Sequence, residues 1–320
     1  MNMVYYMNLS IIIATLDRPD NLDATLKSLL PEAELLKEII IIDQSENRKS
    51  KQICDEYKHK WLPIFYYKFF IKSLTQARNF WIIKLSPNTD IVLFLDDDVT
   101  LAKDCLSKLE SYIDTYQPKW WVLNIETPSR YINTLKKIWF FLLTGTFKFN
   151  EQFVSQWWFN AMFLTQPIKT KKIERCSGCA MFFRKSLFNE WFKFPEKFQK
   201  YSLMEDVFLS YDIYKRYPGT LHYIPNAKII HHESPIRSIP PKAKIMQNIV
   251  HRFLFVKKFN LSYIWYVRTT ILLGILDLIT YKKISIIQWY LHWFFYVWNN
   301  RKELSLDWSK VDYNMFIFSK

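Results

Sequence analysis

The stretch V-L-F-L-D-D-D-V, residues 92–99, places three carboxylates, Asp96, Asp97 and Asp98, directly after an apolar run. The whole chain carries a formal net charge of +14, so the charge of this acidic cluster is opposite in sign to the net charge of the chain. Adjacent carboxylates repel one another and resist losing water, so they destabilise a fold unless a cation or a proton compensates them. The stretch therefore predicts a site for a positively charged group.

Short apolar runs recur along the chain and alternate with segments of helical spacing. Residues 9–14 (L-S-I-I-I-A) and 38–42 (E-I-I-I-I) have the pattern of strands buried on both faces of a parallel sheet. Between them, apolar side chains at 22, 26, 29 and 30 predict a helix over 21–30. The further expected elements are helices at 49–59, 74–85 and 205–217, and strands at 64–70, 91–95, 179–183 and, in short pieces, 220–231. This alternation predicts an α/β layered domain.

The acidic triplet lies at the carboxyl end of the strand expected at 91–95, which is the edge of an open α/β sheet where ligands bind. If strand geometry persists, Asp96 and Asp98 point to one side and Asp97 points aside. Carboxylate oxygens suit Mg²⁺ or Mn²⁺. The plain alternative is that the triplet simply ends the strand in water.

Polar groups also follow the first two expected strands. In the loop A-T-L-D-R-P-D-N, residues 14–21, Arg18 is placed to meet a phosphate or a base edge, and Asp20 or Asn21 is expected to cap the next helix. Asp43 follows the second strand, where it could accept a hydrogen bond from a ribose or base, or simply form a strand-end turn.

Three further motifs carry groups that could act in chemistry. The pair Arg78-Asn79 opens an expected helix, where it could reach a diphosphate or form a solvated face. Glu205-Asp206 opens another helix, where the dipole favours carboxylates, and one of them could also remove a proton. His231 and His232 are neighbours in a strand and point to opposite faces, so at most one of them is expected to bind the same metal, and a structural role is the alternative.

The chain has four cysteines, too few for a disulfide framework at this length. Cys176 and Cys179 have the spacing of a redox pair or of half a zinc site. No second pair completes a four-cysteine site, which favours buried thiols.

In their order along the chain, the motifs resemble the family-2 glycosyltransferases of the GT-A fold over residues 8–235. They are T-x-x-R, D-Q-S, A-R-N, F-L-D-D-D, S-G-C-A-M-F-F-R-K, E-D-V-F-L and A-K-I-I-H. The resemblance implies a Rossmann-like mixed central sheet flanked by helices. It also implies an inverting, metal-dependent hexosyl- or deoxyhexosyltransferase that moves one sugar from a UDP-, dTDP- or GDP-linked donor to a hydroxyl of a glycan acceptor.

The resemblance also implies roles for single residues. Those expected to hold the nucleotide sugar are Thr15, Arg18, Asp43, Arg78, Asn79, Asp96 and Asp97. Asp98 and His231 are expected to hold Mn²⁺ or Mg²⁺, and Asp206, beside Glu205, matches the catalytic base. Family members often have Gly-Gly where this chain has Gly178-Cys179. The floor of the acceptor-binding site is therefore expected to differ from theirs. The chain lacks the Q-x-x-R-W motif of processive polysaccharide synthases, which implies single addition.

The last quarter of the chain is more basic than the rest. From Ile236 to Lys320 there are 13 Lys plus Arg and 4 Asp plus Glu, so nine of the fourteen net positive charges lie there. Pro235, Pro240 and Pro241 predict a boundary between a catalytic domain, 1–235, and a helical C-terminal region, 236–320. Within the first part, residues 130–170 are rich in Trp and Phe and are expected to form an irregular insertion or an acceptor-side lid.

Basic pairs bracket two aromatic-rich segments of this region, 259–281 and 284–300. The first is not expected to span a bilayer, because Arg268 and Asp277 would each cost about 2.5 to 3.5 kcal/mol at the membrane centre. The composition predicts helices lying in an anionic headgroup layer, with a subdomain packed on the catalytic core as the alternative. We expect a cytoplasmic protein at the inner face of the cell membrane, with a lipid-linked acceptor in bacterial-type surface polysaccharide (O-antigen or capsule) assembly.

Two other function classes remain at this point. A non-catalytic nucleic-acid binder would use the basic aromatic region, but the acidic cluster would repel a phosphate backbone, so no nucleic-acid partner is expected. A Mg²⁺-dependent phosphoryl-transfer enzyme would be expected to have an acid at the end of the first strand, where this chain has Ala14 and Thr15.

Overall fold

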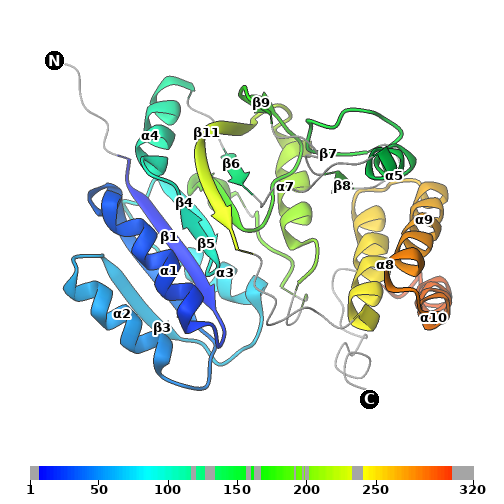
Figure 1. Cartoon of the computed structure of the whole chain (residues 1–320), viewed down its shortest axis with the longest axis horizontal. Coiled ribbons are helices and arrows are strands. Elements are labelled where there is room, and N and C mark those ends of the chain that lie inside the picture. The colour runs from blue at the N-terminus through cyan, green and yellow to red at the C-terminus, as the bar shows by residue number, and fades with distance from the viewer. Residues whose placement is uncertain are drawn as a thin grey trace.

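The structure is a computed structural model, and it describes residues 7–116, 120–126, 134–155, 160–161, 167–190, 192–196, 198, 202–232 and 241–304. A central sheet crosses the molecule, and three helices of the C-terminal region lie at one end of it (Figure 1). The strands of the sheet are, in spatial order, β3 (Ile64–Lys68), β2 (Leu36–Asp43), β1 (Leu9–Thr15), β4 (Ile91–Asp96), β10 (Ala180–Arg184), β6 (Trp120–Glu126), β11 (Leu221–His231) and β5 (Val99–Leu101), with β9 (Lys171–Lys172) also paired to β11.

The sheet is mixed, as the resemblance implies. Strands β1 to β4 are mutually parallel, β10 runs antiparallel to both β4 and β6, and β11 runs parallel to β6. Strand β5 pairs antiparallel with β11, and its register sets His231 opposite Val99. The histidine at the end of β11 is thereby brought next to the acidic triplet at the end of β4.

The alternation of side chains along each strand sorts the apolar runs into two layers. Ile11 and Ile13 of β1 face a core shared with α1 (Pro19–Leu29), α2 (Lys49–His59) and α4 (Cys105–Tyr116). Ile12 faces the opposite core, which is shared with α3 (Leu74–Ile82) and α7 (Glu205–Arg216). A continuous apolar run is therefore needed in the sequence, because both faces of the sheet are covered.

Two sequence expectations about local structure are wrong. Helix α1 begins at Pro19, with Arg18 at the N-cap and no side-chain cap hydrogen bond, so neither Asp20 nor Asn21 caps it. Proline suits the first turn because its fixed φ is already helical. Residues 221–231 form one strand, β11, with a register shift between Ile224 and Lys228, where short separate strands were expected.

The described part of 130–170 is not irregular. It contains α5 (Thr134–Thr144) and a small two-stranded sheet of β7 (Phe153–Val154) and β8 (Asn160–Ala161). The side chain of Arg268 donates to the carbonyl oxygen of Leu142 at 2.7 Å, so α5 is joined to the C-terminal region.

The C-terminal region contains α8 (Pro241–Lys258), α9 (Tyr263–Tyr281) and α10 (Ser285–Asn299). The two aromatic-rich segments correspond to α9 and α10, whereas sequence inspection missed α8. Helix α8 shares a third core with α7, in which Phe208 and Tyr211 pack with Phe255. The proline boundary expected at 235–240 lies outside the described residues. Remaining short elements are η1 (Leu30–Leu35) and α6 (Ser186–Asn189).

Candidate active site

The end of β4 and the end of β11 bring three potential metal ligands together. One ligand atom from each of Asp96, Asp98 and His231 lies within 4.8 Å of the others. Nε2 of His231 is 3.3 Å from Oδ1 of Asp98. The neighbouring His232 instead contacts the hydroxyl of Thr100 at 2.9 Å, so the two histidines separate as strand geometry predicts.

Arg18 neutralises part of this acidic cluster. Its guanidinium lies 2.8 Å from Asp97 and 2.9 Å from Asp98, with about a quarter of the arginine side chain exposed. Burial raises the pKa of Asp97 to about 7, while the charge of Arg18 opposes that rise. Burial also raises the pKa of Asp96, against the nearby charge of Arg78. The three carboxylates of the triplet therefore outnumber the two arginines beside them, and the site favours binding of an added cation.

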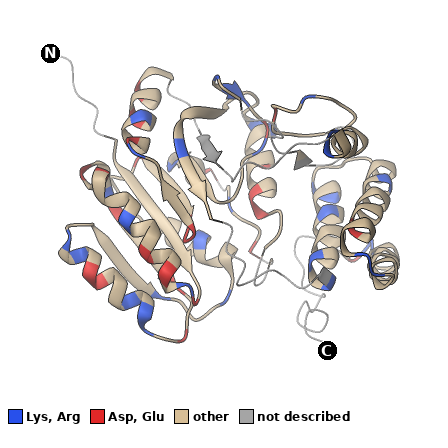
Figure 2. Cartoon of the chain, in the orientation of Figure 1, with Lys and Arg blue, Asp and Glu red and all other residues tan. Residues whose placement is uncertain are grey.

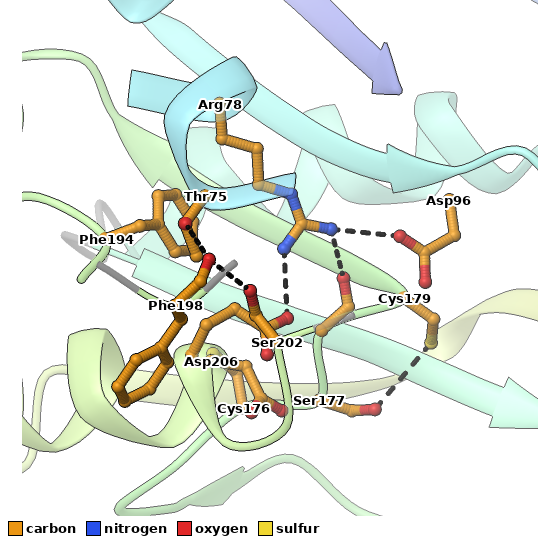
Figure 3. Close-up of polar contacts among 12 residues, drawn as sticks. Thr75, Arg78, Asp96, Cys176, Ser177, Cys179, Phe194, Phe198, Ser202 and Asp206 are labelled. Carbon is orange, nitrogen blue, oxygen red and sulfur yellow. Dashed lines mark hydrogen bonds and ion pairs between the residues drawn. The ribbon is translucent and has the colours of Figure 1, made fainter. Parts of the chain in front are cut away.

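Arg78 links the acidic triplet to the Glu205-Asp206 pair (Figure 3). Its guanidinium donates to Asp96 at 2.9 Å, to Glu205 at 3.3 Å and to the carbonyl oxygen of Gly178 at 3.2 Å. Arg78 is buried, so one guanidinium fixes the distance between two acidic motifs that are more than 100 residues apart in sequence.

Helix α7 presents Glu205 and Asp206 in its first turn, where the helix dipole stabilises negative charge. Oδ2 of Asp206 accepts from Nη2 of Arg175 at 2.9 Å, and its Oδ1 accepts from the backbone of Val207 at 2.8 Å. Burial, followed by the charge of Asp206, raises the pKa of Glu205 to about 8. The two neighbouring carboxylates are thus bound by different arginines, Arg78 for Glu205 and Arg175 for Asp206.

Gly178 lets the acidic pair approach the start of β10. A Cβ at this position would lie 3.2 Å from Oε1 of Glu205 and 3.5 Å from Cβ of Asp206. A larger residue would require the Glu205 carboxylate to shift by a few tenths of an ångström, whereas Asp206 would remain in ordinary contact. The adjacent Cys179 and Cys176 are buried free thiols, as expected, and burial raises the pKa of both.

Some residues expected to hold the nucleotide have partners within the protein. Asp43 accepts from the hydroxyl of Tyr66 at 2.6 Å and from Lys68 at 3.3 Å. The amide of Asn79 donates to the backbone of Phe194 at 2.8 Å and accepts from it at 2.9 Å. Asn79 therefore anchors the segment after α6, and we leave it out of the proposed site.

Thr15 is buried at the end of β1, on the same sheet edge as the acidic triplet. Its carbonyl oxygen accepts from the backbone of Gln44, so the loops after β1 and β2 are joined. Thr15, Asp43 and Arg18 thus lie at or just after the carboxyl ends of adjacent strands, the sheet edge where ligands bind in α/β folds, and their contact with a nucleotide stays a prediction.

Arg175 is the site residue that sequence inspection missed. It is buried, and it binds the carbonyl oxygen of Cys176 as well as Asp206. The only sequence signal was an arginine directly before the C-S-G-C stretch, and its pairing with an acid 31 residues later depends on the fold.

Comparison with known proteins gives a family match. The family model described as "Glycosyl transferase family 2" matches residues 10–192. No curated protein matches the chain.

Several solved structures share the fold. TarS 1–349 of S. aureus is 18% identical with a TM-score of 0.51, and the match covers 78% of this chain and 66% of that one. GalNAc-T7 with UDP, GalNAc and Mn²⁺ is 16% identical with a TM-score of 0.57, over 82% of this chain and 56% of that one. The mannosyltransferase PcManGT of Pyrobaculum calidifontis, in complex with GDP-Man and Mn²⁺, is 12% identical with a TM-score of 0.51, over 80% and 64%. The chain thus spans about two thirds or less of these neighbours, and the GT-A fold is common to them.

Proposed function

Because the chain belongs to glycosyl transferase family 2, we propose that it moves a single sugar from a nucleotide-diphosphate sugar to a hydroxyl group of a glycan acceptor, with inversion at the anomeric carbon. The observation that carries the proposal is the position of Arg78, which binds Asp96 on one side and Glu205 on the other. A donor held by the acidic triplet would therefore lie beside the acids of α7. This arrangement supports a donor site and a proton acceptor that lie next to each other.

The residues present fit a divalent cation. Asp96, Asp98 and His231 offer two carboxylates and one imidazole within 4.8 Å of one another, a donor set that favours Mn²⁺ slightly over Mg²⁺. Asp98 and His231 would hold the cation, with Asp96 next to the sugar nucleotide. When bound, the cation would neutralise charge on the diphosphate.

The protein's own groups account for the remaining steps. Arg18, at the N-terminus of α1, is positioned to bind a phosphate in exchange for Asp97 and Asp98. Asp206 would take the proton of the acceptor hydroxyl as its oxygen attacks the anomeric carbon. The bond from that carbon to the diphosphate oxygen breaks in the same displacement, and the diphosphate leaves with the electron pair. Arg175 would keep the Asp206 carboxylate oriented toward the acceptor.

The finer assignments follow from the same reasoning. UDP-, dTDP- and GDP-linked hexoses or deoxyhexoses are the donor class, and a lipid-linked glycan of a bacterial-type surface polysaccharide (O-antigen or capsule) is the acceptor that a cytoplasmic, peripherally membrane-bound enzyme would meet. TarS has been solved in complex with UDP-GlcNAc, which supports a UDP-sugar as the first donor to test.

Replacing Asp206 by Asn tests the catalytic assignment. The change preserves size and hydrogen bonding but removes the proton acceptor, so turnover is expected to fall by at least about 100-fold while donor affinity stays nearly unchanged. Calorimetric titration with nucleotide sugars and a transfer assay on the same preparation measure both. If Asp206→Asn keeps wild-type turnover and Glu205→Gln is inactive, the base is Glu205.

Asp98→Ala tests the metal assignment. We expect the variant to lose the part of nucleotide affinity that depends on Mn²⁺, because a ligand is removed from a site that is not part of the apolar core. Isothermal titration with and without Mn²⁺ measures that difference. The assignment fails if the Mn²⁺-dependent increment in affinity is the same in Asp98→Ala and the wild type.

A further inference from the structure

Three helices expose apolar side chains on their outer surfaces. On α10 and its entry turn the exposed residues recur every three or four positions, which is one helix face. These residues are Ile284, Ile287, Leu291, Phe295 and Trp298. On α9 they are Ile264, Ile271, Ile275 and Ile279, and on α5 they are Leu135, Ile138 and Phe141. We call these twelve residues the outer apolar face.

The α9 and α10 parts of this face carry few charged groups. Arg268 and Asp277 are the only charged residues of α9, and both are bound within the protein. Arg268 donates to the Leu142 carbonyl of α5, and Asp277 accepts from the hydroxyl of Tyr290 on α10 at 2.8 Å. Helix α10 contains no Asp, Glu, Lys or Arg. A surface helix in water normally carries charge on its outer side, so this face is adapted to something other than water.

Exposed cations lie next to the ends of α9 and α10 and on α5. Lys282 and Lys283 lie between α9 and α10, and Arg301 and Lys302 follow α10. Lys136 and Lys137 are exposed on α5. Figure 2 shows α9 and α10 as largely uncharged helices with basic residues near their ends. This combination of an apolar centre with a basic edge is complementary to an anionic phospholipid surface.

We propose that α5, α9 and α10 together form a platform that lies in the interfacial plane of an anionic bilayer. As an account of how the enzyme reaches a lipid-linked acceptor, the proposal rests on the proposed function; lipid binding itself does not depend on it. The platform includes α5, which lies outside the C-terminal region. It also specifies which side of α9 and α10 contacts lipid.

The platform lies on the bilayer and does not cross it. Helix α9 is long and apolar enough to span, by length and composition alone. However, the inner side of α10 is covered by α8, where Ile286, Trp293 and Val297 are buried in the core shared with α7. Helix α8 also buries His251 and Arg252. A spanning α9–α10 pair would have to leave α8 or carry these polar groups into hydrocarbon.

Vesicle flotation of the full-length protein tests the platform. We expect it to float with vesicles of phosphatidylcholine and phosphatidylglycerol at low salt. Leu291→Glu should weaken this partition by roughly tenfold or more, because an exposed leucine that the lipid would cover is replaced by a charge that the anionic surface repels. Ile83→Glu is the matched control, since Ile83 is 81% exposed at the end of α3, outside the platform. Equal binding by both variants would overturn the proposal.

Site-specific labelling tests the orientation and the role of α5. The four native cysteines are buried, so an environment-sensitive thiol dye can be placed on single introduced cysteines. Dye on Phe295→Cys and on Ile138→Cys should shift to the blue when the same vesicles are added, whereas dye on Ile83→Cys should not. A shift at Phe295→Cys with none at Ile138→Cys would remove α5 from the platform and overturn the three-helix form of the proposal.

Other occupants of the face give different results. A second copy of the chain would produce a concentration-dependent dimer that Leu291→Glu abolishes, without vesicle binding. A spanning α9 would make the protein resist alkaline carbonate extraction. Either result contradicts the platform. Donor affinity measured by titration with a nucleotide sugar and Mn²⁺ is expected to be unchanged in Leu291→Glu, so a failure of the proposed function is distinguished from a failure of lipid binding.

Discussion

Glu205 and Asp206 are neighbours in the chain, yet their surroundings differ. Glu205 is buried against Gly178 and shares Arg78 with Asp96, and its pKa is raised to about 8 by burial and then by the charge of Asp206. Asp206 is paired with Arg175 and is the more exposed of the two. The raised pKa favours the protonated form of Glu205, which reduces its repulsion with nearby carboxylates.

This difference predicts a pH dependence of stability. Because the folded-state pKa of Glu205 lies above its ordinary value of 4.5, the folded state holds the proton more tightly, and stability falls as pH rises from about 5 to about 8. Glu205→Gln removes this contribution. Without divalent cations, the melting temperature of the variant relative to wild type should therefore rise across that pH range. A constant difference from pH 5 to pH 9 would show that Glu205 does not titrate there.

At the same scale, sequence inspection found most of the acids but not their partners. Asp96, Asp98 and His231 could be grouped because strand ends of one sheet edge meet. The pairing of Arg175 with Asp206, and the three partners of Arg78, depend on how β10 and α7 pack, which no local pattern specifies. The hydrogen bonds of Asn79 could not be predicted for the same reason, since its partner Phe194 is 115 residues away.

At the scale of elements, apolar runs predicted the central strands well, because burial on both faces demands a continuous run. Strands β1, β2 and β4 therefore differ from expectation by a few residues at most. The short β5 and the amphipathic α4 and α8 were missed. The antiparallel direction of β10 could not be predicted either, because strand direction depends on the path of the connecting chain.

Helix α7 begins at a strained residue. Met204 adopts a left-handed conformation with φ of 75° at the N-cap, and its side chain is buried. Met204→Gly would relieve about 1 kcal/mol of backbone strain but would lose about 2 to 5 kcal/mol of buried packing. The packing loss is larger than the strain relief, so we expect the free energy of unfolding to fall by about 1 to 4 kcal/mol, as measured by urea titration.

Lys282→Gly is the control for that prediction. Lys282 has a similar left-handed conformation, with φ of 52° at the C-cap of α9, but its side chain is exposed. Glycine should be neutral or stabilising there by up to about 1 kcal/mol. If Met204→Gly proves more stable than wild type, burial of the Met204 side chain stabilises the fold by less than the backbone strain at this residue destabilises it.

At the scale of the whole molecule, the catalytic domain and the C-terminal region share a core. The rings of Phe208 and Phe255 meet edge to face at 5.2 Å between centroids, and Tyr211 packs on Phe255 at the same distance. Lys258 also pairs with Asp212 at 2.6 Å. Removing residues from 236 onward would expose the apolar side of α7, which carries the acidic pair of the site. A soluble, active fragment ending near 235 is therefore not expected.

Phe255→Ala tests this coupling. The ring is fully buried between α8 and α7, so its loss should cost about 3 to 5 kcal/mol of stability. Because the core is shared, helix content measured by circular dichroism and donor binding measured by ligand fluorescence should be lost together, at one lower temperature. Phe295→Ala is the matched control, since that ring is 56% exposed on α10 and its removal should change stability by less than about 0.5 kcal/mol. If Phe255→Ala instead melts in two steps and retains donor binding after the first, the C-terminal helices unfold independently and the acids of α7 do not depend on them.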